Sequence, residues 1–178
     1  MDIVTHLGEV KIVNEPTYSF DSADNVRSYL FSENLCSKSS PVSVHGVLLD
    51  EEPLAVFGAA GGATGVHRHS AFWLNECLYL AICDTVVCMG LRPFEVLWSL
   101  RVDSATCFGI YFHAETNSLL SHGELEITRF TEAGTILWQS GGHDIFSGAF
   151  VLASSFIEAE DFYGHPHRFL YSTGKNAD

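Results

Sequence analysis

TEAGTILWQS, residues Thr131–Ser140, has the composition of a small-residue turn that runs into a strand carrying a tryptophan. Forty residues earlier the chain reads RPFEVLWSLR, residues Arg92–Arg101, and the two Leu-Trp pairs coincide at this offset. Trp98 and Trp138 are two of the three tryptophans in the chain. This register predicts an internal repeat, and a period near forty residues is the length of a four-stranded blade.

The same offset extends in both directions. Pro93 coincides with Pro53 one period earlier, and Gly134 coincides with Gly174 one period later. We therefore predict that Trp98, Trp138, Gly134 and Gly174 are structural residues of successive repeats, without a part in chemistry.

Within one repeat, the run ELEITRF (Glu124–Phe130) alternates between apolar and polar residues, which is the period of a half-buried strand. Gly134 can adopt the positive φ that a tight reversal needs before the next strand. The pattern predicts a mainly β fold, an antiparallel meander of blade-like repeats with short loops.

The longer run HGELEITRFTEAGTILWQSGG (His122–Gly142) resembles the repeat of quinoprotein-type (PQQ-like) and WD-like β-propellers. The resemblance covers residues 42–178 and implies a propeller-like fold. These residues make roughly three and a half blades of about forty residues, fewer than the four or more that usually close a ring. We carry over no quinone or calcium site. In this copy the matching residues are Gly123, Leu125, Ile127, Gly134, Leu137 and Trp138.

Residues 1–41 do not fit the repeat, and we predict that they form an N-terminal cap on residues 42–178 within one domain. GEVKIVN (Gly8–Asn14) has the composition of a strand. FDSADNVRSYLFSENL (Phe20–Leu35) predicts a short helix with Asp21 or Ser22 as its N-cap. Ser37–Pro41 is the expected linker.

The charge of the chain argues against two classes of partner. With 22 acidic and 9 basic residues, the net charge is −13. Phosphate groups of nucleic acids and anionic membranes both require clustered Lys and Arg, so neither partner is expected. The sequence shows no signal peptide, and its five cysteines form no Cys-x-x-Cys pair. We expect a cytoplasmic protein with reduced thiols.

GGATGVHRHS (Gly61–Ser70) contains the strongest candidate for chemistry. The spacing of Gly61, His67 and His69 matches the opening of the cupin metal motif. On a strand the two imidazoles would share one face and could bind a metal together. The cupin glutamate is missing, because the first glutamate after His69 is Glu76. GHPHR (Gly164–Arg168) is a second His-x-His stretch.

These observations favour a noncatalytic binding or protein-interaction module with no catalytic residue and no cofactor. Open strand edges predict a protein partner, which includes a second copy of the chain. The alternative is a small metal-dependent enzyme of cupin-like type. It would use His67, His69 and either His113 or His122 to hold a divalent transition metal.

Overall fold

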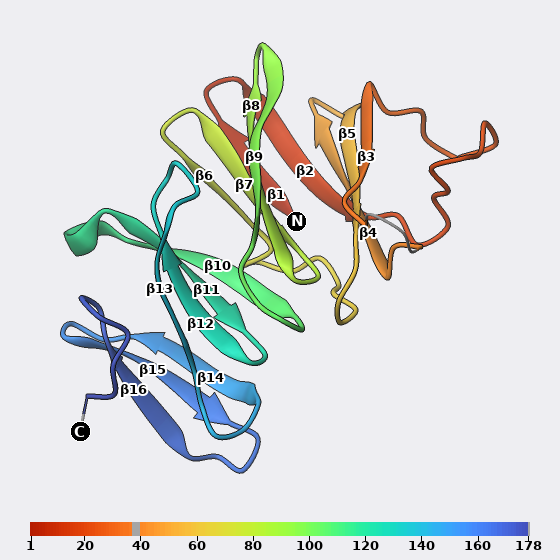
Figure 1. Cartoon of the computed structure of the whole chain (residues 1–178). Coiled ribbons are helices and arrows are strands. Elements are labelled where there is room, and N and C mark those ends of the chain that lie inside the picture. The colour runs from red at the N-terminus through yellow and green to blue at the C-terminus, as the bar shows by residue number, and fades with distance from the viewer. Residues whose placement is uncertain (37–39, 178) are drawn as a thin grey trace.

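A computed structural model describes residues 1–36 and 40–177. Four small sheets follow one another along the chain as successive layers (Figure 1). The described part of the chain forms no closed ring. The fold is thus almost entirely β and propeller-like, as the alternating sequence pattern predicts.

The first sheet has five strands in the order β1-β2-β4-β5-β3. All its pairs are antiparallel except β3 with β5, which is parallel. Strands from both sides of residue 41 therefore build this sheet. Its strands are β1 (Asp2–Thr5), β2 (Gly8–Asn14), β3 (Phe31–Asn34), β4 (Ser43–Leu49) and β5 (Glu52–Ala59).

The second and third sheets are four-stranded antiparallel meanders, each following chain order. The second contains β6 (Ala71–Leu74), β7 (Cys77–Ile82), β8 (Thr85–Leu91) and β9 (Phe94–Arg101). The third contains β10 (Cys107–His113), β11 (Ser118–Gly123), β12 (Glu126–Phe130) and β13 (Ile136–Gly141), with a 3-10 turn at Ala114–Thr116.

The fourth sheet has three strands, β14 (Phe146–Leu152), β15 (Phe156–Asp161) and β16 (Pro166–Leu170). Beyond β16 the chain reverses, and Asn176 forms an isolated bridge with Phe169. Leu170 N donates to Lys175 O at 2.8 Å, and Ala177 N donates to Arg168 O at 2.9 Å. Through these bonds residues 175–177 run antiparallel to β16 along its outer edge, in the place of a short fourth strand.

Three apolar cores hold the layers together, one at each junction between successive sheets. Phe57 and Leu80 lie in the first core, Tyr79 and Phe130 in the second, and Phe169 in the third. Strands β6, β7 and β8 of the second sheet direct alternate side chains into the first and the second core. Burying both faces of a middle sheet removes its apolar side chains from water, which is the main stabilising contribution here.

The two tryptophans of the repeat occupy the outermost strands of successive sheets, Trp98 on β9 and Trp138 on β13. Trp98 Nε1 donates to Glu132 O at 3.1 Å, and Trp138 Nε1 donates to Tyr171 O at 2.7 Å. Each acceptor lies in the turn that follows the third strand of the next sheet. The same side chain therefore makes the same kind of contact at two successive junctions.

A glycine lies against each tryptophan ring. Gly134 has a φ of +77°, and a Cβ there would lie 2.8 Å from Cδ2 of Trp98. Gly174 has a φ of +67°, and a Cβ there would lie 2.6 Å from Cε3 of Trp138. Both the backbone conformation and the close ring require glycine at these positions.

The helix predicted over residues 20–35 is wrong, because this segment is irregular up to β3. Local side-chain bonds compete with helical ones here. The Asn25 amide donates to the carbonyls of Ser19 and Ser22 at 2.8 and 2.9 Å. Val26 and Leu30 are 87% and 77% exposed, so the apolar side of the expected helix is not buried. Of the predicted linker, residues 37–39 lie outside the described residues.

Candidate functional site

The connection between the second and third strands in spatial order, β2 and β4 in the first sheet, distinguishes the first sheet from the next two. Two residues join β7 to β8 and two join β11 to β12, whereas residues 15–42 join β2 to β4. We call the described residues of this connection, 15–36 and 40–42, the insertion, and it includes β3. Figure 1 shows it on the side of the first sheet away from the second sheet. Long connections on a rigid scaffold are common positions for binding sites, so we looked for a site here.

The insertion packs on the first sheet through aromatic rings placed over two glycines. A Cβ at Gly46 on β4 would collide with the hydroxyl end of Tyr29. A Cβ at Gly58 on β5 would lie 2.7 Å from Cε2 of Phe20. The absence of side chains at the two glycines is what allows the rings to approach the sheet.

A buried carboxylate fixes the base of the insertion. Glu15 Oε1 accepts hydrogen bonds from Arg27 Nη1 and from the Tyr29 hydroxyl, both at 2.6 Å. Glu15 is 6% exposed, so the pair lies largely out of water. Burial, with the Glu15 hydrogen bond second, raises the pKa of Tyr29, and the Glu15 hydrogen bond raises the pKa of Arg27. Tyr29 therefore stays a neutral donor and Arg27 a cation at physiological pH.

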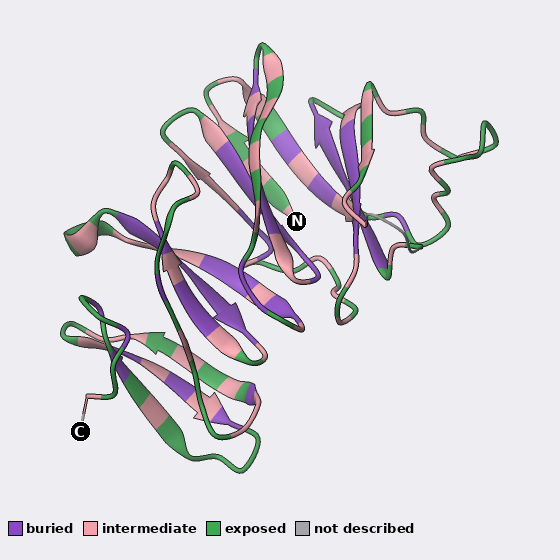
Figure 2. Cartoon of the chain, in the orientation of Figure 1, coloured by how far each residue is buried: buried purple, intermediate pink, exposed green. Residues whose placement is uncertain are grey.

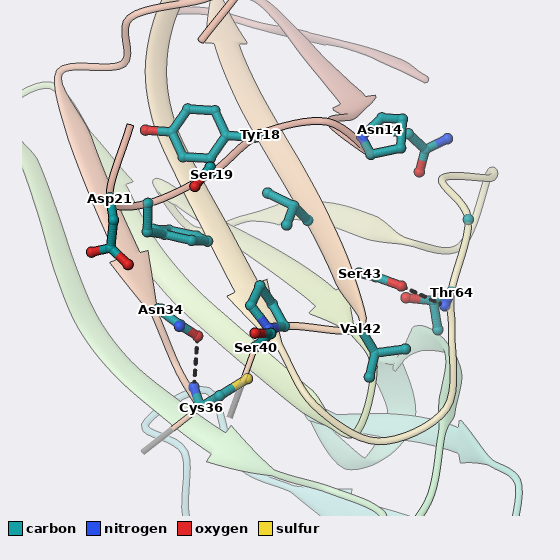
Figure 3. A pocket seen from close by; sticks show the side chains of 15 residues that line it. Asn14, Tyr18, Ser19, Asp21, Asn34, Cys36, Ser40, Val42, Ser43 and Thr64 are labelled. Carbon is teal, nitrogen blue, oxygen red and sulfur yellow. Dashed lines mark hydrogen bonds between the residues drawn. The ribbon is translucent and has the colours of Figure 1, made fainter. Parts of the chain in front are cut away.

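Between the insertion and the first sheet lies a pocket of about 880 Å³ (Figure 3). The insertion forms one side, the ends of β2 and β4 form another, and the loop before β6 forms a third. Its lining residues are Asn14, Pro16, Tyr18, Ser19, Phe20, Asp21, Asn34, Cys36, Ser40, Pro41, Val42, Ser43, Val44, Thr64 and Gly65.

Backbone groups already use the acceptor side of several polar side chains in this pocket. Asn14 Oδ1 accepts from Val66 N at 3.0 Å, Asn34 Oδ1 accepts from Cys36 N at 3.0 Å, and Ser43 Oγ accepts from Thr64 N at 2.9 Å. The amide NH₂ groups of the two asparagines are donors by chemistry. The bonds that Asn14 Oδ1 and Asn34 Oδ1 accept hold the two amide planes in fixed orientations.

The described lining of the pocket combines aromatic rings with amides. Tyr18 and Phe20 contact each other edge to face, with centroids 5.2 Å apart. Among the described lining residues, Asp21 is the only charged one. These residues offer a ligand both apolar and hydrogen-bonding groups.

The predicted metal ligands His67 and His69 do not lie on a strand, contrary to expectation. They belong to the loop and turn that precede β6. His67 Nδ1 accepts a hydrogen bond from the backbone N of His69 at 3.2 Å, and Arg68 Nε donates to His69 Nε2 at 2.9 Å. His69 stacks on Tyr111 with centroids 4.4 Å apart. The alternation that was to place both rings on one face is therefore lost.

The two candidates for a third ligand lie in different surroundings. His113 stacks on Tyr171 at 3.8 Å, and its Nδ1 lies 2.8 Å from Thr116 Oγ1. His122 is buried and stacks on Phe150 at 4.6 Å. Within residues 1–36 and 40–177, no three His, Cys, Asp or Glu side chains are grouped to hold a metal.

His122 is the histidine whose chemistry differs most from that of a free imidazole. Burial, with the nearby His69 ring second, lowers the pKa of His122 to about 4. Its Nε2 is buried and has no hydrogen-bond partner among the residues that the structure describes. The ring is therefore neutral at pH 7 and packs as an aromatic group between the third and fourth sheets.

The second His-x-His stretch lies at the turn between β15 and β16. His167 Nε2 lies 2.9 Å from Asp161 Oδ2, and His165 Nδ1 lies 3.4 Å from the same oxygen. Backbone N–H groups of Tyr163 and His165 donate to Asp161 Oδ1, each at 2.9 Å. The His167 hydrogen bond is the main cause that lowers the pKa of Asp161 to about 2. This carboxylate organises the turn.

The residues of the pocket were not among the site residues predicted from the sequence. One signal could have found the region: the insertion lengthens a connection that is only two residues long in each of the next two sheets. Trp98, Trp138, Gly134 and Gly174 lie at the junctions between sheets and do not line the pocket. None of the described residues forms a helix long and apolar enough to span a bilayer.

The sequence matches no family model and no curated protein. Among solved structures, BamB from Moraxella catarrhalis is similar over 85% of this chain and 50% of its own length, with 12% identity and a TM-score of 0.54. The computationally designed protein Ika4 is similar over 66% of this chain and 75% of its own, with 12% identity and a TM-score of 0.51.

A second designed protein, Ika8, is similar over 79% of this chain and 46% of its own length, with 12% identity and a TM-score of 0.54. The chain spans about half the length of BamB and of Ika8. At this identity the similarity concerns the fold alone. The chain has the fold of PQQ-like and WD-like β-propeller repeats, arranged here as an open stack of four sheets.

Proposed function

We propose that this chain is a noncatalytic binding module that holds a segment of a partner protein in the pocket beneath the insertion. The observation that carries the proposal is the insertion itself. It is the one long connection between the second and third strands of the first three sheets, and it builds a pocket of about 880 Å³ on a propeller-like scaffold.

The lining of the pocket supports a polypeptide as its ligand. Tyr18 and Phe20 offer apolar surface, and the asparagine amides can donate to peptide carbonyls. Asp21 can accept from peptide N–H groups or contact a basic side chain. A propeller-like fold fits this use, because it supports binding to proteins through its loops.

Site-specific photo-crosslinking tests the proposal. A benzophenone side chain at Val42, which lines the pocket and is 53% exposed, should crosslink a partner protein in cells that make this chain. The matched control is Val26, which belongs to the same insertion, is 87% exposed and does not line the pocket. We expect the Val42 crosslink to disappear when Asn34→Ala is added. Equal crosslinking at Val26 and Val42, or none at Val42, would reject the pocket as the binding site.

The noncatalytic part of the proposal has its own test. Metal analysis of protein purified without an affinity tag should find no stoichiometric Fe, Mn or Zn. Stoichiometric metal that is lost in a His67→Ala/His69→Ala variant would instead support the metal-dependent alternative.

The partner can include a second copy of the chain, and the cytoplasm remains the expected compartment. Cys77, Cys83, Cys88 and Cys107 form no disulfide, in keeping with a reducing environment. Light scattering after size exclusion measures self-association, and fractionation of the source cells locates the protein.

A further inference from the structure

The outer face of β4 and β5 in the first sheet has the composition of a face that packs against another sheet. Side chains alternate along a strand, and His45, Val47 and Leu49 of β4 belong to the side that faces the second sheet. On β4 and β5 the opposite side presents Val44, Leu48 and Val56, which are 8%, 3% and 0% exposed, whereas β2 carries Glu9 and Lys11 on that side. Between them lie Gly46 and Gly58.

The insertion is what buries this face. Tyr29 covers Gly46, and Phe20 covers Gly58 together with Pro41. Backbone bonds fasten the insertion along the edge, because Leu35 N donates to Gly58 O and Val42 N donates to Ala59 O, both at 2.8 Å. The Glu15–Arg27–Tyr29 contacts fix its beginning. Without the insertion, an apolar sheet face of the kind that holds the stack together would lie in water.

We propose that the insertion is an end cap that keeps the outer face of the first sheet from associating with the same face of a second copy. An apolar face exposed at the end of a stack of sheets is a site for association, and a terminal unit needs a cover to stay soluble. Two copies that meet through the same surface form a closed, twofold pair, which requires no second type of surface. This proposal concerns self-association and goes beyond the binding of a partner in the pocket.

The last sheet does not offer a matching face for the uncapped first sheet. Ile157, Ala159 and Phe169 face the third sheet. The alternate positions on the outer side carry Glu158 and Arg168, which form an ion pair at 2.8 Å. An apolar face of one copy gains little from a charged face of another, because the charges would lose water. A first-sheet to first-sheet pair is therefore the association that removal of the cap should produce.

The chain supplies the design for an uncapped variant. β2 and β4 are already antiparallel neighbours, with Asn14 opposite His45. Because Glu15 N donates to Val44 O at 2.9 Å, residues 16–43 can be replaced by a two-residue turn that copies Cys83-Asp84, which joins the equivalent strands of the second sheet. This deletion also removes the edge strand β3, which the full-length variant described next retains. We expect size exclusion with light scattering to give this variant twice the mass of the wild type at equal concentration. A folded variant with the wild-type mass would overturn the proposal.

A second variant keeps the chain length and loosens the cap, and it decides the question if the shortened chain does not fold. Phe20→Ala/Tyr29→Ala removes the two rings that cover the glycines. We expect faster hydrogen exchange in β4 together with a concentration-dependent rise in mass toward the doubled value. The matched control is Phe162→Ala/Tyr163→Ala, two rings that are 64% and 70% exposed at the β15–β16 turn. Faster exchange in β4 without any rise in mass, or an equal rise in the control, would overturn the proposal.

Discussion

The first sheet and the last sheet each have one face that no neighbouring sheet covers, and these two faces carry different residues. On β4 and β5 of the first sheet the face is apolar, and the insertion lies over it. On the last sheet the face is open to water and carries Glu158, Glu160 and Arg168, with Val151 48% and Leu170 39% exposed. Figure 2 shows the contrast as buried strands in β4 and β5 against exposed bands on β14 and β16.

The comparison shows two physical solutions to one problem. A repeat of sheets needs apolar faces inside the stack, yet its end faces meet water. The third sheet turns Leu120, Ile127 and Trp138 toward its neighbour. The last sheet has charged residues on its outer side, so its end face tolerates water directly. The first sheet keeps apolar residues and depends on the insertion for protection, so its end should be the more sensitive to substitution.

The largest difference in the free energy of unfolding is expected between alanine substitutions at two glycines, Gly46 in the first sheet and Gly148 in the last. Gly46→Ala would force the new methyl group into Tyr29, which Glu15 holds in place, at a cost of about 2 kcal/mol in the free energy of unfolding. Gly148→Ala on β14 meets the side chain of Glu160, whose outer carbons can move into solvent but whose Cβ cannot, so its cost should be smaller, about 1 kcal/mol. Urea unfolding of both variants measures the difference. Equal midpoints would show that the insertion does not pack tightly on the sheet.

Acid should weaken the junction next to the last sheet through His122. Because its pKa is about 4 in the folded protein and near 6.5 when unfolded, the unfolded chain binds the extra proton between these values. Stability is therefore complete above pH 6.5 and is lost as the pH falls toward 4, by roughly 1–2 kcal/mol at pH 5.

His122→Phe keeps a ring against Phe150 and should flatten this part of the pH profile of unfolding. Burial also lowers the pKa of His45 at the first junction, so some loss near pH 5 should remain in the variant. Asp161 acts in a lower window, because its pKa is lowered and its contribution is lost only as the pH falls from about 4 toward 2. A profile of His122→Phe identical to that of the wild type would exclude His122 as the cause.

The smallest effects compare one ion pair from each end. Glu15→Gln weakens two short hydrogen bonds at a buried position and should cost about 1 kcal/mol, since Arg27 keeps 39% of its side chain in water. Glu158→Gln removes the pair with Arg168, whose side chain is 51% exposed, and should change stability by less than about 0.5 kcal/mol. Chemical unfolding at low and high salt tests the ranking. A larger loss in the free energy of unfolding for Glu158→Gln than for Glu15→Gln would contradict the conclusion that the first sheet is the end more sensitive to substitution.

The candidate site illustrates where prediction from the sequence ended. The regular repeat predicted the mainly β, propeller-like fold, because hairpins form between neighbouring strands and their signals are local. The pocket lies where the repeat is interrupted, and its lining comes from the insertion, from β4 and from the loop before β6. Residues from three separate stretches meet there only after the insertion has packed on the sheet.

The predicted helix failed for a related reason. Asp21, Ser22, Val26 and Tyr29 have a spacing that suits a capped amphipathic helix. In the structure Tyr29 turns toward Gly46, and the next residues pair with β5 as a parallel edge strand. Tertiary contacts with a sheet thus overrode a local propensity that is worth only a fraction of a kcal/mol per residue.

The histidine pair shows the same limit. The spacing of His67 and His69 predicts a shared face only if the segment is a strand, and strand formation depends on a partner for the backbone. The segment is held instead by bonds to distant side chains, such as Val66 N to Asn14 Oδ1 and Thr64 N to Ser43 Oγ. These bonds place it in a loop between the first and second sheets.

By itself the sequence determined the β content, the period of about forty residues and the recurrence of Trp98 at Trp138 and of Gly134 at Gly174. These features depend on alternation, turn chemistry and a spacing that recurs along the chain. The tertiary structure decided that residues 1–14 complete the first sheet, that the insertion covers its outer face, and that a pocket lies between them. The reason is that strand order and the covering of a face depend on contacts between distant residues, which no local pattern encodes.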